Sequence, residues 1–324
     1  TLSGANTYSG GTPVSVGTLA LGSGGSLAAS TALNVASGAT LDISGASSAQ
    51  TVGSLAGAGS VLLNNQTLTT GGNNTSTTYT GVISGGGSLA KTGTGTLTFS
   101  GANAYSGGTT ISGGTLVAAH ASALGSGAVT VGTGATLEVA HGTTLQVGDN
   151  LTFHADSTYR VFADPSSGDS SKIEVAGTAT LAGSVLHVGK ELNAATDFQV
   201  GKTYTILHAQ KIVDRFGAAT SNYAYLDTAL DYTATDVTLQ LQRKNSGNGN
   251  GNGNMHFADL ADSHNQASAA NGIESLGRGN PLFDHIETLP QGAPAAVLAS
   301  LSGDTHPGVQ SSLVGLSAQA PGLS

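Results

Sequence analysis

Two stretches of this chain have almost the same amino-acid sequence, and this repetition limits the possible folds more than any other feature. Residues 2–12 read Leu-Ser-Gly-Ala-Asn-Thr-Tyr-Ser-Gly-Gly-Thr, and residues 99–109 read Phe-Ser-Gly-Ala-Asn-Ala-Tyr-Ser-Gly-Gly-Thr. Residues 31–43 match residues 127–139 in the same way, at an offset shorter by one residue. A stacked solenoid tolerates such a slip because each coil contacts only its neighbours.

Short runs of alternating apolar and hydroxyl-bearing residues occupy the sequence between the turns. Within residues 87–139, each run ends after a few positions at Gly or Asn. Alternation with a period of two, cut by turn residues, indicates short strands with one buried face. The sequence therefore predicts an all-β fold, a right-handed parallel β-helix (solenoid) with roughly 20 to 25 residues per coil.

This pattern also predicts which side chains point inward. The expected positions are Val14, Val16, Leu19, Leu21, Leu33, Val35, Leu41, Ile43, Leu55, Val61, Leu63, Leu68, Val82, Leu89, Leu97, Phe99, Ile111, Leu116, Val129, Val131, Leu137 and Val139. Six of them form the expected repeat core: Leu97, Phe99, Ile111, Leu116, Leu137 and Val139.

Composition excludes several classes of protein. The net charge is −9, and the ten Lys and Arg residues form no basic stripe, so we expect no nucleic-acid partner. The chain has no Cys, which rules out disulfides and thiolate metal sites. Seven Pro residues are too few for collagen, and the apolar alternation argues against disorder.

The character of the chain changes near residue 150. Only four of the fifteen Phe and Tyr residues precede this point. Strand-like runs continue to residue 243 with fewer glycines, which predicts a better packed core and a stability that rises towards residue 240. We therefore separate a stalk, residues 1–149, from a terminal β region, residues 150–243.

The pattern becomes helical after a linker. Residues 244–254 read Lys-Asn-Ser followed by alternating Gly and Asn and have nothing to bury, which is typical of a flexible linker. Within residues 255–324, we expect a helix from His256 to about Ser275, a second that begins at Pro281 after the N-cap Asn280, and a third from Pro294 to Gly303. A further helix is expected to begin at Pro307. These short helices show apolar faces without an evident core of their own, which suggests packing on a downstream domain.

Residues 87–116 resemble the passenger-associated transport repeat of autotransporter proteins, the type V secretion proteins of Gram-negative bacteria. Phe99 stands where that pattern usually has Leu, and the matching positions are Gly87, Leu89, Lys91, Gly93, Gly95, Leu97, Ser100, Gly101, Asn103, Tyr105, Gly107, Gly108 and Thr109. Residues 150–244 are similar to the pertactin-like C-terminal passenger region called the autochaperone. Residues 270–306 look like the segment before the β-barrel in subtilisin-type autotransporters.

The resemblance implies a β-helical stalk that displays an effector, and a C-terminal region that folds first and drives secretion across the outer membrane. The folding nucleus that we predict from it comprises Leu151, Phe153, Tyr204, Leu207, Phe216, Tyr225, Leu239 and Leu241. The implied partners are the chain's own β-barrel translocator, the barrel-assembly machinery and periplasmic chaperones. The implied location is the cell surface or outer membrane, or the medium after cleavage.

Motifs for catalysis are weak in this sequence. Gly201-Lys202-Thr203 imitates the end of a phosphate loop, but Thr196 stands where that motif needs Gly. The nine His residues are dispersed, and Asp164, Asp169 and Glu174 read as a polar loop near Ser170 and Ser171. We therefore expect no catalysis, cofactor or metal in these residues.

Two other functions remain open at this point. The uncharged Thr and Ser faces are compatible with an adhesin that binds a host surface or self-associates. Alternatively, the chain is the stalk of an autotransporter serine protease whose catalytic domain lies upstream. The sequence begins inside a repeat, at Thr1, so we expect the chain to be a fragment of a longer protein.

Overall fold

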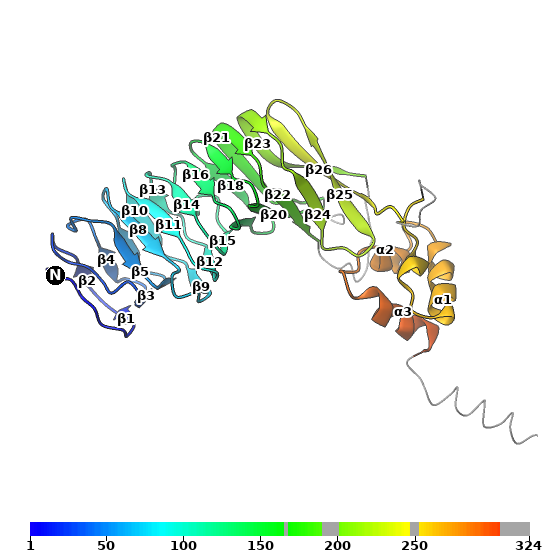
Figure 1. The fold of residues 1–324 in the computed structure, drawn as a ribbon, viewed down its shortest axis with the longest axis horizontal. Coiled ribbons are helices and arrows are strands. Elements are labelled where there is room, and N and C mark those ends of the chain that lie inside the picture. The colour runs from blue at the N-terminus through cyan, green and yellow to red at the C-terminus, as the bar shows by residue number, and fades with distance from the viewer. Residues whose placement is uncertain (165–167, 190–200, 247–252, 305–324) are drawn as a thin grey trace, which may run out of the picture.

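A computed structural model describes residues 1–164, 168–189, 201–246 and 253–304. The chain winds into an elongated solenoid, with the N-terminus at one end and short helices at the other (Figure 1). Within the described residues, the strands stack in three sheets that run along the solenoid axis. The parallel β-helix predicted from the sequence is therefore confirmed.

Each coil contributes short strands to these sheets. The first sheet follows the order β1 (Thr12–Val14), β3 (Ala32–Val35), β6 (Ser54–Gly57), β9 (Thr77–Tyr79), β12 (Thr96–Phe99), β15 (Thr115–Ala118), β17 (Thr136–Val139), β20 (Thr158–Phe162), β22 (Ser184–Val188) and β24 (Ala218–Ser221). The second follows the order β2 (Thr18–Ala20), β4 (Thr40–Asp42), β7 (Ser60–Leu62), β10 (Val82–Gly85) and β13 (Ala104–Tyr105).

The third sheet carries the strands that close the solenoid. Its order is β5 (Gln50–Val52), β8 (Thr67–Thr70), β11 (Ser88–Lys91), β14 (Thr109–Ile111), β16 (Val129–Val131), β19 (Leu151–Phe153), β21 (Lys172–Leu181), β23 (Thr203–Asp214), β26 (Asp236–Arg243) and β25 (Leu226–Tyr232), with β18 (Thr144–Val147) also paired to β21.

Equivalent side chains of successive coils lie in register and form one continuous core. Leu97 pairs with Leu116, Leu116 with Leu137, and Leu137 with Tyr159, which gives coils of about 20 residues. The buried cluster extends without a break from Val14 to Leu241. Burying each Leu in this column stabilises the stack by roughly 1.5–3 kcal/mol.

Two of the expected inward positions were wrong. Val16 is 84% exposed because it follows the end of β1, in a turn where Gly17 has a φ of 68°. Val82 is 42% exposed because its neighbour Ile83 takes the inward position in β10. In β10 the sequence offers apolar residues at both parities, and a strand of period two buries only one of them.

The corners require residues without side chains where coils touch. A Cβ atom on Gly101 would lie 1.9 Å from the carbonyl oxygen of Gly81 in the preceding coil. Gly93 has a φ of 66°, and a Cβ there would lie 2.0 Å from the Gly71 oxygen. Glycine is therefore needed at these corners for close approach as well as for its backbone angles.

The C-terminal end of the solenoid differs from the coils before it. The long strand β21 pairs with β18 in its first half and with β19 in its second, across a register shift between Val175 and Thr178. Strand β23 continues the parallel stack, but β26 pairs with β23 in the antiparallel sense and β25 pairs antiparallel with β26. The parallel stack is therefore closed by an antiparallel hairpin.

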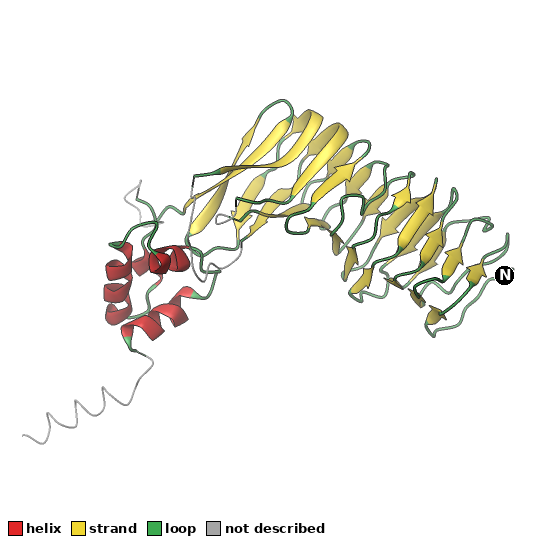
Figure 2. Ribbon diagram, turned by 180° about the vertical axis from the view of Figure 1, so that it is seen from behind, coloured by secondary structure: helices red, strands yellow, loops and turns green. Residues whose placement is uncertain are grey.

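Four short helices gather beyond this hairpin, at the end of the solenoid away from the N-terminus (Figure 2). They are the 3₁₀ helix η1 (Phe257–Leu260) and the α-helices α1 (His264–Glu274), α2 (Pro281–Glu287) and α3 (Pro294–Ser302), all within the described residues. We call residues 253–304 the helical module.

The starts of α2 and α3 lie where the sequence predicts them. Asn280 caps α2 by accepting a hydrogen bond from the Leu282 backbone nitrogen. Gly303 ends α3 with a φ of 79°. The single helix expected from His256 is wrong, because residues 261–263 separate η1 from α1. The helix expected at Pro307 lies outside the described residues.

The helical module has a core of its own, contrary to the expectation from the sequence. The buried residues that form this second core are Ala224, Tyr225, Phe257, Ala270, Ile273, Phe283, Ile286, Leu289 and Leu298. The first two come from the loop between β24 and β25, so the end of the solenoid completes the core. The two ends of the Gly/Asn stretch also meet, because Asn245 forms an antiparallel bridge with Asn254.

Candidate functional site at the closed end of the solenoid

Asn103 of the repeat ties three coils together at one corner. Its side-chain oxygen accepts a hydrogen bond from the Ile83 backbone nitrogen at 2.8 Å. Its side-chain nitrogen donates to the Ala123 carbonyl oxygen at 2.7 Å. Asn103 itself is buried, and a buried amide that is satisfied on both sides fixes the register of the stack.

The tyrosine of the repeat makes the same local contact in both copies. The hydroxyl groups of Tyr105 and Thr109 lie 2.6 Å apart, and those of Tyr8 and Thr12 also lie 2.6 Å apart. Tyr105 is fully buried, whereas Tyr8 is 37% exposed. Burial raises the pKa of Tyr105 well above its usual value. In both copies the tyrosine therefore packs on the turn that follows it.

Lys91 places a cation inside the solenoid. Its side chain is buried, in register between Thr70 and Ile111 of the neighbouring coils. Its ammonium group donates to the carbonyl oxygens of Thr92, Gly93 and Gly113, at 2.7, 3.2 and 3.1 Å. Burial lowers the pKa of Lys91. The three carbonyl groups satisfy the three donors of the ammonium group, and they come from two successive coils.

The six residues of the expected repeat core all line the interior. Leu97 is 2% exposed and the other five are fully buried. Phe99 also packs edge-on against Tyr79 of the preceding coil, with ring centroids 6.1 Å apart.

Three aromatic rings fill the last parallel coils. The ring centroids of Phe153 and Tyr159 lie 5.8 Å apart, and Phe216 lies 5.4 Å from the first and 6.2 Å from the second. The Tyr159 hydroxyl donates to the Ile206 carbonyl oxygen at 2.9 Å. This cluster joins strands that are more than forty positions apart in the sequence, so it can form only when the terminal coils come together.

The residues of the predicted folding nucleus fall into two groups. Seven of them lie in the main core: Leu151, Phe153, Tyr204, Leu207, Phe216, Leu239 and Leu241. Tyr225 lies instead in the core of the helical module, where its hydroxyl donates to the Phe257 carbonyl oxygen at 3.1 Å. The order in which these residues fold is still a prediction.

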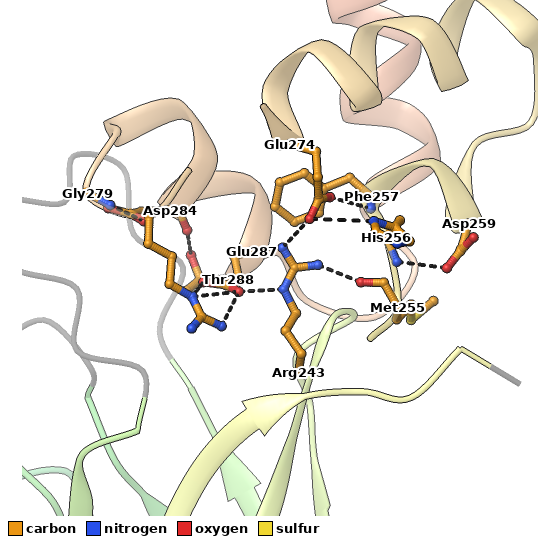
Figure 3. A network of polar contacts seen from close by, with 11 residues as sticks. Arg243, Met255, His256, Phe257, Asp259, Glu274, Gly279, Asp284, Glu287 and Thr288 are labelled. Atoms are coloured by element: carbon orange, nitrogen blue, oxygen red, sulfur yellow. Dashed lines mark hydrogen bonds and ion pairs between the residues drawn. The ribbon is translucent and has the colours of Figure 1, made fainter. Parts of the chain in front are cut away.

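Arg243, at the end of β26, connects the solenoid to three parts of the helical module (Figure 3). Its guanidinium group donates to Glu287 of α2 at 2.5 Å, to Glu274 of α1 at 3.1 Å and to the Met255 carbonyl oxygen at 2.7 Å. The Arg243 side chain is 6% exposed and that of Glu287 is fully buried. Charge-assisted bonds of this kind are about twice as strong as neutral ones.

Further contacts complete this buried network. Arg278 binds both carboxylate oxygens of Glu287, at 2.9 and 3.1 Å. Glu274 also accepts from the Phe257 backbone nitrogen at 2.8 Å. The guanidinium carbon of Arg243 lies 4.3 Å from the centroid of the Phe257 ring. Arginine is well suited to this position because it can form several ion pairs and stack on an aromatic face together.

A second junction uses the backbone. The Ala224 nitrogen donates to the Leu289 oxygen at 2.7 Å, and the Gln291 nitrogen donates to the Asn222 oxygen at 2.8 Å. Tyr223 forms an antiparallel bridge with Pro290 between these bonds. Sequence analysis missed both junctions, since their partners lie far apart in the chain and no local pattern marks them.

The other candidate sites have structural explanations. Lys202 precedes β23, and Ser171 accepts a hydrogen bond from the Phe162 backbone nitrogen at 2.9 Å. In the parts of the chain that the structure describes, no three acidic or histidine side chains converge as metal ligands would. No described helix is long and apolar enough to span a membrane.

Comparisons with known proteins agree with the repeat and the fold. The passenger-associated transport repeat family matches residues 1–21 and 89–118. Over 243 residues, the chain is 34% identical to the adhesin BmaC autotransporter of Brucella suis biovar 1 (strain 1330). The match covers 72% of this chain but 7% of that relative. The chain therefore spans only a small part of the curated relative that it matches.

Proposed function

Because these residues form an autotransporter passenger-type β-helical stalk with passenger-associated transport repeats, we propose that the closed end of the stalk directs its folding during secretion. The hairpin β25–β26 and the terminal aromatic cluster provide a first folded template. Earlier coils then stack on this template one at a time.

The antiparallel closure of the stack is the observation that carries this proposal. Strand β23 pairs with β21 on one edge and with β26 on the other. A coil of about 20 residues that docks on a folded edge closes only a short loop, and it gains strand pairing and apolar burial in one step. A first coil without a template must form its contacts alone, which is slower.

The residues described here act without catalysis in this proposal. Their partners are the chain's own translocator barrel, the barrel-assembly machinery and periplasmic chaperones, and their place of action is the cell surface or the medium after cleavage. Free energy of folding then helps to retain exported chain, since no nucleotide is available outside the outer membrane.

The polarity of folding provides the test. Leu239 and Leu33 are both buried inward residues, at opposite ends of the solenoid. We expect Leu239→Asp, in the chain exported through its barrel, to leave every coil sensitive to protease. Leu33→Asp should expose only the coils next to it. Equal, local damage from both substitutions would rule out a C-terminal template.

An adhesin role is the second candidate, since the similar Brucella protein is named an adhesin. The outward face of the third sheet carries a register of uncharged residues. Following the pairing, these are Thr51, Thr69, Ala90, Thr110, Thr130, Thr152 and Thr180. Sedimentation of the purified chain at micromolar concentration, together with cell binding, tests this candidate: a monomer that binds no cells argues against it.

A further inference from the structure

His187 differs from the other described histidines because it is completely buried. It lies in β22 at an inward position, in register with Val161 of the preceding coil and Ser221 of the next. The ring therefore occupies a place in the column that apolar side chains fill in earlier coils, such as Val139 and Ala118.

The contacts of His187 determine its neutral form. Its Nε2 lies 2.9 Å from the Ala163 carbonyl oxygen, which can only accept, so Nε2 carries the proton. Its Nδ1, 3.0 Å from the Ser221 hydroxyl, then accepts a hydrogen bond from that group. The Ser221 oxygen in turn accepts from the Tyr223 backbone nitrogen at 3.2 Å. A proton on Nδ1 would turn this acceptor into a donor and displace the Ser221 hydroxyl proton.

The segment held by His187 also holds the helical module. The Ser221 carbonyl oxygen accepts from the Gln291 side chain at 3.0 Å. The next three residues, 222–224, form the backbone junction with residues 289–291 described above. The His187 carbonyl oxygen accepts a hydrogen bond from the Asn222 backbone nitrogen at 3.1 Å. The histidine therefore binds this segment through both its ring and its backbone.

The charged and titratable groups nearest this site in the chain and in space are Tyr223, Asp164 and Lys244. The Tyr223 ring lies 5.4 Å from that of His187. Asp164 follows Ala163, and its largely buried carboxylate lies 4.0 Å from Nε2 of the half-exposed His141. Lys244 donates to the Tyr223 carbonyl oxygen at 2.7 Å and adds positive charge on that side. Burial lowers the pKa of His187 from 6.5 to about 4.

We propose that His187 is an acid-sensitive latch, which on protonation releases the segment 221–225 and with it the helical module, while the parallel coils stay folded. The neutral form of the His187 ring stabilises the docked helical module, and docking in turn favours the neutral form of the ring. Acid therefore opens the joint between stalk and helices before it unfolds the stalk.

The magnitude follows from linkage. A buried ring with a folded pKa of about 4 and an unfolded pKa of 6.5 resists protonation. Its contribution to docking is complete well above pH 6.5 and is lost as the pH falls through about 4. Between about pH 7 and pH 4.5, the opening equilibrium should shift by about 50-fold.

Hydrogen exchange on the whole chain at these two pH values tests the latch. After correction for intrinsic exchange rates, protection in residues 257–298 should fall by about 50-fold at the lower pH. Protection in residues 88–153 should stay unchanged. In His187→Gln, whose amide bonds without titrating, the change should be less than about threefold. His208→Gln, which removes a half-exposed histidine at the same end of the stalk, should behave as the unaltered chain does.

Two outcomes would overturn the proposal: an equal loss of protection in His187→Gln, or simultaneous opening of the helical module and the coils. The carboxyl groups of the Arg243 network are the same in both proteins, so the difference between them isolates the histidine. Should His187→Gln fail to fold, an NMR titration of His187 in the unaltered chain replaces it. The midpoint of that titration must then coincide with the pH at which the module opens, and a mismatch refutes the latch.

Discussion

Replacing Arg243 by Met should detach the helical module from the stalk without unfolding the coils. Met retains an unbranched apolar stem over the Phe257 ring but removes the bonds to Glu287, Glu274 and the Met255 carbonyl oxygen. Glu287 is completely buried, so the substitution leaves a buried carboxylate with one arginine partner in place of two.

The expected cost follows from this burial. Breaking a buried ion pair by removing one partner costs about 3–5 kcal/mol. Arg278 still binds Glu287 through two bonds, so we expect the lower end of that range. About 3 kcal/mol corresponds to an opening equilibrium increased by about 150-fold.

Amide hydrogen exchange at neutral pH measures this opening directly. Residues 257–289 should exchange about 150-fold faster in Arg243→Met, while residues 88–153 keep their protection. Arg278→Met is the matched control, because the Arg278 side chain is 43% exposed. It should cost at most about 1 kcal/mol, a change of about fivefold or less. Equal effects of the two substitutions, or exchange that rises along the whole stalk, would refute the reasoning.

Three further predictions concern the solenoid. Leu137→Asp should lower the free energy of unfolding of the coils around it by more than about 3 kcal/mol, because it would place a charge in the buried apolar core. Equilibrium denaturation measures this change, and an unchanged midpoint contradicts the prediction. Gly101→Ala should destabilise the stack by at least about 2 kcal/mol, because its Cβ would collide with a carbonyl of the preceding coil, whereas Gly72→Ala has open space and should be nearly neutral in the same assay. Burial raises the pKa of Tyr204 to about 12, so its contribution to stability should be complete below about pH 10 and fall as the pH rises through 12. The difference in alkaline absorbance between the unaltered chain and Tyr204→Phe reports ionisation of Tyr204 alone, and ionisation of Tyr204 at pH 10 without unfolding would disprove this.

The coils show what local sequence patterns can predict about burial and what they cannot. The alternation around Leu97 and Leu137 predicts which side chains are buried, because a strand has only two faces. The same rule failed at Val82, where the parity of the strand depends on the position of Ile83 in the stack. Repetition thus identified the architecture, whereas neighbouring coils decided the register.

The packing of the closed end could not be predicted from any short segment of the sequence. The aromatic residues after position 150 predicted a well-packed region, and most of the expected nucleus lies in the main core. Tyr225 does not, since helices that follow it in the chain fold back over it. Arg243 appears in the sequence as a charged residue beside a Gly/Asn stretch, and its partners Glu274 and Glu287 follow 31 and 44 positions later.

The sequence by itself determined the repeated coil, most of its inward positions, its glycine corners and the starts of α2 and α3, because each rests on residues within one coil or one helical turn. Only the tertiary structure decided how the stack ends: an antiparallel hairpin, a shared aromatic core and a buried arginine network join segments distant in the chain. Their energies depend on desolvation and on distances between groups in space, which spacing along the chain does not encode.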